Sequence, residues 1–232
     1  MKMTEPTLYE FLEQQIELYG DELVMPLSTL EQVGFKRPGV TTPSWKTSMN
    51  LEELHESIRE CKNCPRCISR QQVILGQGRP QAMITIVSDM PDDLSDQHQV
   101  PVAGEEHDLL EKILAAVQIG RDETYFCNVL KCRGSRPAYA FAEEIKQCVP
   151  YLKKQLQLIR SPIILCLGEL AAQTILSSKK KLFQLRGTVY KYEDAQVVVT
   201  HHLRDLLTSV PLKKETWADI KMLRRLYDEK LR

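Results

Sequence analysis

The sequence predicts an α/β fold of three layers, α/β/α, built around a central four-stranded parallel sheet. Two observations support this prediction. Short apolar segments of strand length alternate along the chain with longer segments of helical period. The strand-like segments are apolar at nearly every position, as expected for strands covered on both faces. Strands separated by helices pair in parallel, because the chain has to cross over the sheet between them.

Four segments have the composition of buried strands, being short, rich in Val, Ile and Leu, and followed by polar or turn-forming residues. In chain order they are "MITIVSD" (83–89), "YFCNVL" (125–130), "PIILCLG" (162–168) and "AQVVVTHH" (195–202). In open parallel sheets, functional residues lie on the loops that follow the carboxyl ends of the strands. Those loops begin here at Ser88, Asn128, Gly168 and Thr200.

Helical segments separate these strands. Residues 105–119 are amphipathic and carry acidic residues in the first turn, where a negative charge favours a helix N-terminus. Further helices are expected over residues 138–160 and 169–176, and a last helix closes the chain. The apolar face of that last helix consists of Trp217, Ile220, Leu223 and Tyr227.

The first quarter of the chain has a different character. Residues 7–20 have the apolar periodicity of an amphipathic helix, and residues 25–49 have the Pro-, Ser- and Thr-containing composition of a linker. We therefore divide the chain into an N-terminal extension, residues 1–49, and one domain, residues 50–232. Asn50 is the expected N-cap of the first helix of that domain.

Composition limits the classes of function. The chain has 232 residues, 43% of them hydrophobic, and a formal net charge of zero, which argues against a polycationic coat for nucleic acid. No apolar run has the length of a membrane span, and the N-terminus lacks the apolar region of a secretory signal. We therefore expect a cytoplasmic protein, in which seven cysteines serve as thiols or metal ligands rather than in disulfides.

Three of the cysteines are packed into "ECKNCPRCIS" (60–69), where Cys61, Cys64 and Cys67 form two overlapping C-x-x-C pairs. Such a pair, together with two distant cysteines near strand ends, can hold zinc or an iron–sulfur cluster, and spacing alone does not choose between them. The distant candidates are Cys132, after the second strand, and Cys148, on the following helix. The two mid-strand cysteines, Cys127 and Cys166, are expected to be buried as small hydrophobic residues.

Several segments resemble the family 4 uracil-DNA glycosylases. "NVLKCRGSRP" (128–137) is similar to the family segment N-V-x-K-C-R-P-P-x-N-R-x-P. The resemblance covers roughly residues 58–228, with its motifs in the family's order. The other similar segments are "VILGQGRPQAMITIVSDMP" (73–91), "VPVAGEEHDLLEKIL" (100–114), "CVPYLKKQLQLIRSPIILCLGELAAQTIL" (148–176), "LRG" (185–187) and "THHLRDLLTSVPLKKETWADI" (200–220).

The resemblance implies a uracil-DNA glycosylase-like fold and a structural [4Fe–4S] cluster. In register with the family, the cluster ligands are Cys61, Cys64, Cys132 and Cys148, and Cys67 is a spare thiol. The alternative is that Cys64 and Cys67 form the C-x-x-C pair.

The resemblance also implies three roles at the bond to the base. Asn128 would read the uracil edge, because an amide offers both a donor and an acceptor. His202 would donate a hydrogen bond to the charge that develops on the departing base. Asp89 would orient water and stabilise the sugar cation. From the residues alone, a turn-forming Asn, a polar strand end and a turn-capping Asp remain the alternatives.

Other positions depart from the family. Ser88, Met90 and Asp92 stand where the family has small residues, mostly glycine, and Leu203 replaces a proline. Val102 replaces a phenylalanine expected to stack on the base, which forfeits about 1–3 kcal/mol of stacking. Met90 and Val102 are nevertheless the expected walls of the base pocket. The expected DNA contacts are Arg186, Leu206 and Leu207, and the lysine run 179–181 is a further candidate for phosphate.

Two functional hypotheses follow. The first is a monofunctional glycosylase that hydrolyses the N-glycosidic bond of uracil or another deaminated base in DNA repair, since no lysine occupies a motif position suited to Schiff-base attack. The second is a catalytically silent binding module similar to the psi subunit of the bacterial clamp loader. In both, DNA is the expected partner and the chain is expected to be a monomer. The N-terminal extension is a candidate docking arm for a replisome or repair protein.

Overall fold

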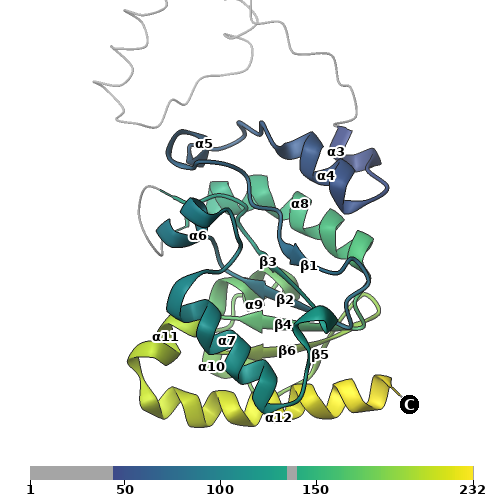
Figure 1. The fold of residues 1–232 in the computed structure, drawn as a ribbon, viewed down its shortest axis with the longest axis vertical. Helices are drawn as coiled ribbons and strands as arrows, with labels where there is room; N and C mark the ends of the chain where they lie inside the picture. The colour runs from purple at the N-terminus through teal and green to yellow at the C-terminus, as the bar shows by residue number, and fades with distance from the viewer. Residues whose placement is uncertain (1–43, 135–139, 232) are drawn as a thin grey trace, which may run out of the picture. The chain divides into compact units, whose positions relative to one another are not determined.

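The structure is a computed structural model, and it describes residues 44–134 and 140–231. Within these residues a six-stranded sheet runs in the order β1-β3-β2-β4-β6-β5 (Figure 1). Its four central strands are parallel and are the four that the sequence predicts. They are β3 (Thr124–Asn128), β2 (Ile84–Ser88), β4 (Ile163–Leu167) and β6 (Ala195–Thr200).

The two edge strands were not predicted. β1 (Gln77–Gly78) pairs antiparallel with β3, and β5 (Tyr190–Tyr192) pairs antiparallel with β6. With two and three residues, these strands are too short to show a periodicity of their own, so only their partners identify them. The turn between β5 and β6 also lacks the glycine or asparagine that normally marks a tight hairpin.

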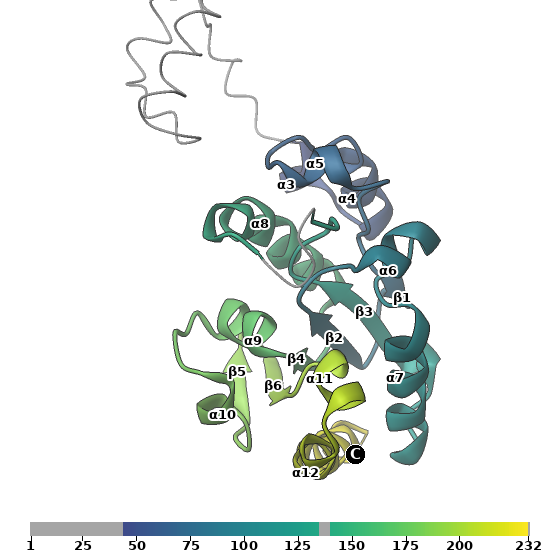
Figure 2. The ribbon, with the colours of Figure 1, turned by 90° about the vertical axis from the view of Figure 1, so that its left-hand side faces the viewer.

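Helices cover both faces of the sheet, as the three-layer prediction requires (Figure 2). On one face, α8 (Ala142–Ile159) and α9 (Glu169–Leu176) pack against the sheet residues Val87 and Val197. On the other face lie α7 (Gly104–Ala116) and α12 (Val210–Lys230). Along the parallel strands successive apolar side chains alternate between the two cores, which is why these strands are apolar at most positions.

The mid-strand cysteines belong to this sheet core. Cys127 of β3 and Cys166 of β4 are fully buried in the cluster that faces α8 and α9. Burial raises the pKa of both thiols, because a thiolate would lose its hydration there. The prediction that these two cysteines behave as small hydrophobic residues is confirmed.

A third apolar cluster underlies the segment before the sheet. α4 (Leu51–Ile58) begins as predicted, with Asn50 Oδ1 accepting the backbone N–H of Glu53 at 2.8 Å. Leu54 and Ile58 of this helix pack with Tyr151 of α8. α3 (Ser44–Thr47) lies inside the segment predicted as linker, and its Trp45 packs edge-on against Tyr151.

The remaining described elements are short connections. They are α5 (Arg66–Ser69), α6 (Asp93–His98), the 3-10 turn η1 (Arg121–Glu123), α10 (Leu182–Leu185) and α11 (Leu203–Thr208). The helix predicted over residues 7–20 lies outside the described residues. Among the described helices, none combines the length and hydropathy needed to cross a bilayer.

Candidate functional site

The carboxyl ends of the parallel strands bring distant polar residues to one edge of the sheet. Ser88 at the end of β2 pairs in register with Asn128 at the end of β3. Across the sheet, β4 ends beside β6, with Leu167 opposite Thr200. The loops predicted to carry the site therefore meet at one edge.

Gly168 shows how tightly these loops approach each other. Its φ of +94° is a backbone conformation that side chains disfavour, and a Cβ placed there would lie 3.3 Å from Asp89 Oδ1 and 3.2 Å from His202 Cδ2. Glycine thus allows the start of α9 to pass between the predicted carboxylate and the predicted histidine. Asp89 and His202, 113 residues apart in the chain, are neighbours of one backbone point.

His202 is buried and held at both ring nitrogens. Its Nδ1 accepts the backbone N–H of Arg204 at 3.1 Å, which caps the start of α11. Its Nε2 lies 2.9 Å from Ser88 Oγ. Burial, with a smaller contribution from the positive charge of Arg204, lowers the pKa of His202 to about 4. The ring is therefore neutral at physiological pH, and a neutral imidazole with an acceptor at Nδ1 carries its proton on Nε2.

Asp89 is a half-buried carboxyl group of the site. Its Oδ1 accepts the backbone N–H of Ala171 in the first turn of α9 at 3.1 Å. Burial raises the pKa of Asp89 to about 7, because desolvation of the carboxylate outweighs this hydrogen bond and the attraction of Arg204. A carboxyl group with such a pKa changes its protonation state near neutral pH, which suits a group that accepts a proton from water.

Asn128 presents an unpaired acceptor. Its Nδ2 donates to the carbonyl oxygen of Pro101 at 2.9 Å, while its Oδ1 is buried without a partner among the described residues. A buried polar atom that lacks a partner costs free energy, on the order of 1–3 kcal/mol. A ligand that supplies an N–H group to this oxygen would recover that cost.

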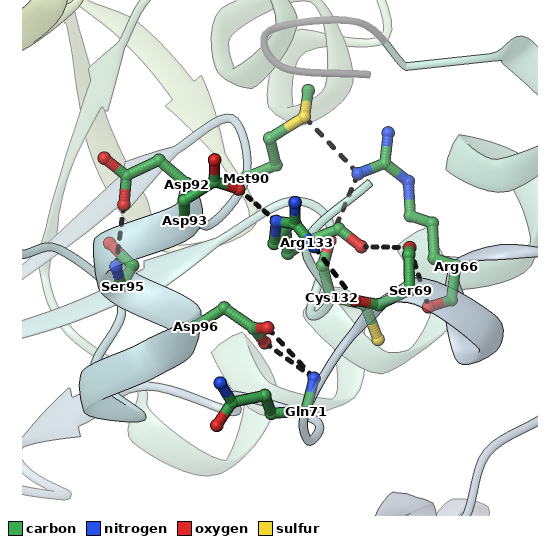
Figure 3. Close-up of polar contacts among 10 residues, drawn as sticks. All are labelled: Arg66, Ser69, Gln71, Met90, Asp92, Asp93, Ser95, Asp96, Cys132 and Arg133. Carbon is green, nitrogen blue, oxygen red and sulfur yellow. Dashed lines mark hydrogen bonds and ion pairs between the residues drawn. The ribbon is translucent and has the colours of Figure 1, made fainter. Parts of the chain in front are cut away.

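The two predicted pocket walls lie in packed cores. Met90 packs with Leu130 and Cys132, and its Sδ accepts a hydrogen bond from Arg66 Nη1 at 3.4 Å (Figure 3). Met90 thus faces the cysteine-rich side of the molecule, which argues against a role as a wall beside the base. Val102 is buried in the core on the α7 and α12 face of the sheet.

Of the three residues predicted to contact DNA, two are engaged or buried within the domain. Arg186 Nε donates to Asp219 Oδ2 at 2.8 Å, and its Nη1 contacts Glu215, with the side chain 12% exposed. Leu206 is fully buried in the fold. Both residues therefore stabilise the domain itself, and the geometry gives no support to the prediction that they contact DNA. Leu207, at 38% exposure, is the one of the three that reaches the surface.

The four predicted metal ligands line one cavity. Cys61 and Cys64 come from the loop after α4, Cys132 follows β3, and Cys148 projects from α8. The cavity has a volume of about 20 Å³. Cys67, the third cysteine of the triplet, is absent from its lining.

Hydrogen-bond donors surround these sulfurs. The backbone N–H of Lys131 donates to Cys148 Sγ at 3.3 Å, Arg70 Nη1 donates to Cys132 Sγ at 3.5 Å, and the Tyr151 hydroxyl lies 3.5 Å from Cys61 Sγ. Donors placed in this way stabilise thiolate ligands and tune the centre that they hold. Burial raises the pKa of Cys148 to about 11 and that of Cys132 to about 12, so these sulfurs ionise only when a positive centre compensates them.

The donor atoms around the cavity bear on which centre it could hold. Among the described residues, no group of three or more His, Cys, Asp or Glu side chains is arranged to hold a single metal ion. Four thiolates can hold either a tetrahedral zinc ion or an iron–sulfur cluster. The donor set of the cavity, all sulfur, is the one that iron–sulfur clusters use.

Two buried cations connect the cavity with the sheet edge. Lys131 Nζ donates to the carbonyl oxygen of Asn128 at 2.6 Å and to Gln155 Oε1 at 2.5 Å. Arg66 pairs with buried Glu144 at 3.0 Å and donates to the carbonyl oxygen of Cys132 at 3.1 Å. Sequence reasoning missed both roles. The signals were weak: Lys131 stands next to a predicted ligand and Arg66 lies within the cysteine triplet, but basic residues in loops are usually exposed.

The described fold agrees with comparisons to known proteins. The model of the Uracil DNA glycosylase superfamily matches residues 75–221. The type-4 uracil-DNA glycosylase of Archaeoglobus fulgidus is 30% identical over 191 residues, which cover 78% of this chain and 96% of that protein. That of Sulfurisphaera tokodaii is 30% identical over 186 residues, covering 76% and 84%. That of Thermotoga maritima is 29% identical over 159 residues, covering 68% and 83%.

Proposed function

Because this chain belongs to the uracil-DNA glycosylase superfamily, we propose that it hydrolyses the N-glycosidic bond of uracil in DNA, the first step of base excision repair. The observation that carries the proposal is the unpaired, buried Oδ1 of Asn128 at the sheet edge shared with His202 and Asp89. Uracil offers an N–H group at N3, whereas cytosine offers an acceptor there. An unpaired amide oxygen thus favours uracil over cytosine.

The chemistry needs the base outside the duplex, in contact with these groups. As the bond from C1′ to N1 breaks, negative charge grows on the base and positive charge on the sugar. The neutral His202 ring at this edge can donate a hydrogen bond toward the negative charge on the base. This donor does not require a charged ring in the free protein. The Asp89 carboxylate would orient the attacking water and stabilise the sugar cation.

The cysteine cavity supports a [4Fe–4S] cluster held by Cys61, Cys64, Cys132 and Cys148. Such a cluster would supply a covalent cross-link, and the hydrolysis itself requires no electron transfer. The four residues would join the loop after α4 to the loop after β3 and to α8. The base-reading residue lies only four positions before one of these ligands, so the cross-link would hold the loop that follows Asn128.

One observation favours the silent binding module as a second candidate. The Nε2 atom of His202, which would meet the base, is already engaged by Ser88. If Ser88 simply occupied that place, a base could not reach this nitrogen. The two candidates differ in one measurable property, which is the release of uracil.

The test is direct. Purified protein with its iron content established is incubated in excess with single- and double-stranded oligonucleotides that carry one uracil, and abasic sites are then cleaved with alkali. We expect strand breaks at uracil and none in matched oligonucleotides that carry thymine. Intact uracil strands under these conditions would reject the glycosylase and leave the binding module.

The pH dependence of excision should follow Asp89. With a pKa of about 7, its carboxyl group is protonated below neutrality and cannot accept a proton from water. The rate should therefore rise with pH and level off above 7, with a loss of roughly 100-fold at pH 5. His202, whose pKa is about 4, stays neutral across this range. Single-turnover rates from pH 5 to 9 check this, and a flat profile for the unmodified protein would remove Asp89 from its role.

Asp89→Asn provides the matched control. An amide has nearly the shape of the carboxylic acid but cannot ionise, so the residual rate of this variant should no longer depend on pH across neutrality. An unchanged inflection near pH 7 in the variant would assign the titration to another group.

Three expectations remain predictions of the sequence. They are a repair or replication partner that docks on residues 1–49, a monomeric state and a cytoplasmic location.

A further inference from the structure

Ser88 and His202 contact each other through their side chains at the edge of the sheet. Ser88 is the last residue of β2 and is 4% exposed. Its Oγ lies 2.9 Å from His202 Nε2, a normal hydrogen-bond distance. Its backbone is held in place as well, since its carbonyl oxygen accepts the N–H of Val129 at 2.8 Å. The hydroxyl group is therefore carried by a rigid strand end.

The direction of this hydrogen bond follows from the other ring nitrogen. His202 Nδ1 accepts the backbone N–H of Arg204, so it carries no proton. Glu106 Oε2 lies 3.9 Å from the same Nδ1 but finds no N–H group there to accept. The single proton of the neutral ring is consequently on Nε2 and points at Ser88 Oγ. Histidine is the donor and serine the acceptor.

The Ser88 hydroxyl keeps its own hydrogen for another acceptor. Among residues 44–134 and 140–231, His202 is the one hydrogen-bond partner found for Ser88 Oγ. Asn128, with its unpaired Oδ1, is the residue paired with Ser88 across the two strands. A free O–H donor and a free amide acceptor thus lie side by side at the end of the sheet. A uracil ring, with carbonyl oxygens on either side of its N3–H group, offers the complementary pattern.

Resting on the proposed function, we propose that Ser88 is the catalytic residue that touches the base. Its hydroxyl donates to a carbonyl oxygen of the departing uracil, and His202 is a positioning residue that acts behind it. The donation from Nε2–H to Oγ polarises the hydroxyl and makes it a stronger donor, because hydrogen bonds in a chain strengthen one another. In this arrangement the serine acts on the base and does not obstruct it.

The hydrolysis needs no reactant other than the DNA and water. The bond from C1′ to N1 breaks, and both electrons stay on uracil, whose carbonyl oxygens share the negative charge. Ser88 and His202 each keep their proton and only share it through hydrogen bonds. Water forms the new bond to C1′ and gives its proton to the Asp89 carboxylate. The uracil anion takes its proton from solvent after release.

The experiment compares single-turnover excision by Ser88→Ala, Ser88→Gly and Ser88→Thr on uracil and on 5-fluorouracil in the same oligonucleotide. Loss of one preorganised donor to a developing anion typically costs 10²- to 10³-fold in rate. We expect a loss of about this size for alanine and glycine on uracil. Threonine, which keeps the hydroxyl, should stay within about tenfold of the unmodified protein. Fluorine stabilises the anion, so the losses on 5-fluorouracil should be clearly smaller.

Comparing uracil with 5-fluorouracil excludes a merely structural effect, because such an effect would lower the excision rates of both bases by the same factor. His202→Ala should show the same selective loss, and the double variant with Ser88→Ala should be no slower than the slower single variant, because the two residues act as one unit. A glycine variant as fast as the unmodified protein, or faster, would overturn the proposal and make Ser88 an obstruction. Equal losses on the two bases would overturn it as well.

A second measurement separates this inference from the proposed function. Nitrogen-15 NMR of labelled histidine should show His202 as the Nε2–H tautomer, with a hydrogen-bonded ring proton that shifts upfield in Ser88→Ala. If the unmodified protein releases no uracil, the proposed function fails on its own, and catalysis by Ser88 fails with it. If it releases uracil but His202 is protonated on Nδ1, the inference alone is rejected.

Discussion

Alanine at Asn128 should slow uracil excision by at least about 10²-fold, and by up to about 10⁴-fold if the amide provides all of the base reading. The physical reason is the unpaired Oδ1, since the site already bears the cost of a buried acceptor that only the correct base can satisfy. Single-turnover excision from a uracil oligonucleotide measures the loss. Discrimination between uracil and cytosine should fall together with the rate. Alanine cannot distinguish the N3–H group of uracil from the unprotonated N3 of cytosine.

Gln157→Ala is the matched control for the loss of an amide. Gln157 lies on the exposed side of α8, and its removal should leave the excision rate unchanged. If Asn128→Ala retained full activity with the fold intact, the assignment of base reading to this residue would be wrong. A loss of thermal stability alone, without a selective loss of excision, would instead indicate that Asn128 mainly holds the Pro101 carbonyl.

Alanine at Cys61 is expected to give the second large effect, loss of the cluster. The protein prepared without oxygen should be brown, and Cys61→Ala should be colourless or depleted in iron and sulfide. Loss of a cross-link between distant parts of the chain should lower the free energy of unfolding by an amount comparable to a lost disulfide, about 2–5 kcal/mol. Iron and sulfide analysis, the visible spectrum and thermal unfolding measure these changes.

Cys67→Ala is the control from the same loop. Both cysteines are half-buried, but only Cys61 lines the cavity. Cys67→Ala should stay brown with an unchanged iron content. The reverse result, a colourless Cys67→Ala and a brown Cys61→Ala, would assign the pair to Cys64 and Cys67. A colourless unmodified protein with stoichiometric zinc would contradict the iron–sulfur assignment altogether.

The elements that the sequence predicted well are those with a strong local signal. Strand β4 and helix α9 appear where expected, since each has the length and apolar pattern of a buried element in a parallel sheet. Asn50 caps α4 because an N-cap depends on a few adjacent residues. β1 and β5 were missed because their pairing partners, and not their own two or three residues, define them.

The family resemblance predicted which residues gather at the sheet edge but not their hydrogen bonds. It brought Asn128, Asp89 and His202 to the same edge of the sheet, where the structure has them. It assigned Arg186 to DNA, whereas Asp219 and Glu215 hold that guanidinium in the structure. A motif records which residue type stands at a position. It does not record which neighbouring carboxylates compete for it.

By itself the sequence determined the α/β class and the four parallel strands, because these depend on local periodicity. The order of the family motifs predicted the four cysteines that share a cavity. Only the tertiary structure decided that carboxylates hold Arg186, and that His202 Nε2 lies within hydrogen-bond distance of Ser88 Oγ. The physical reason is that a hydrogen bond or a shared cavity depends on ångström-scale distances between segments far apart in the chain. Such distances arise from the packing of the whole domain, and no single segment contains the information that sets them.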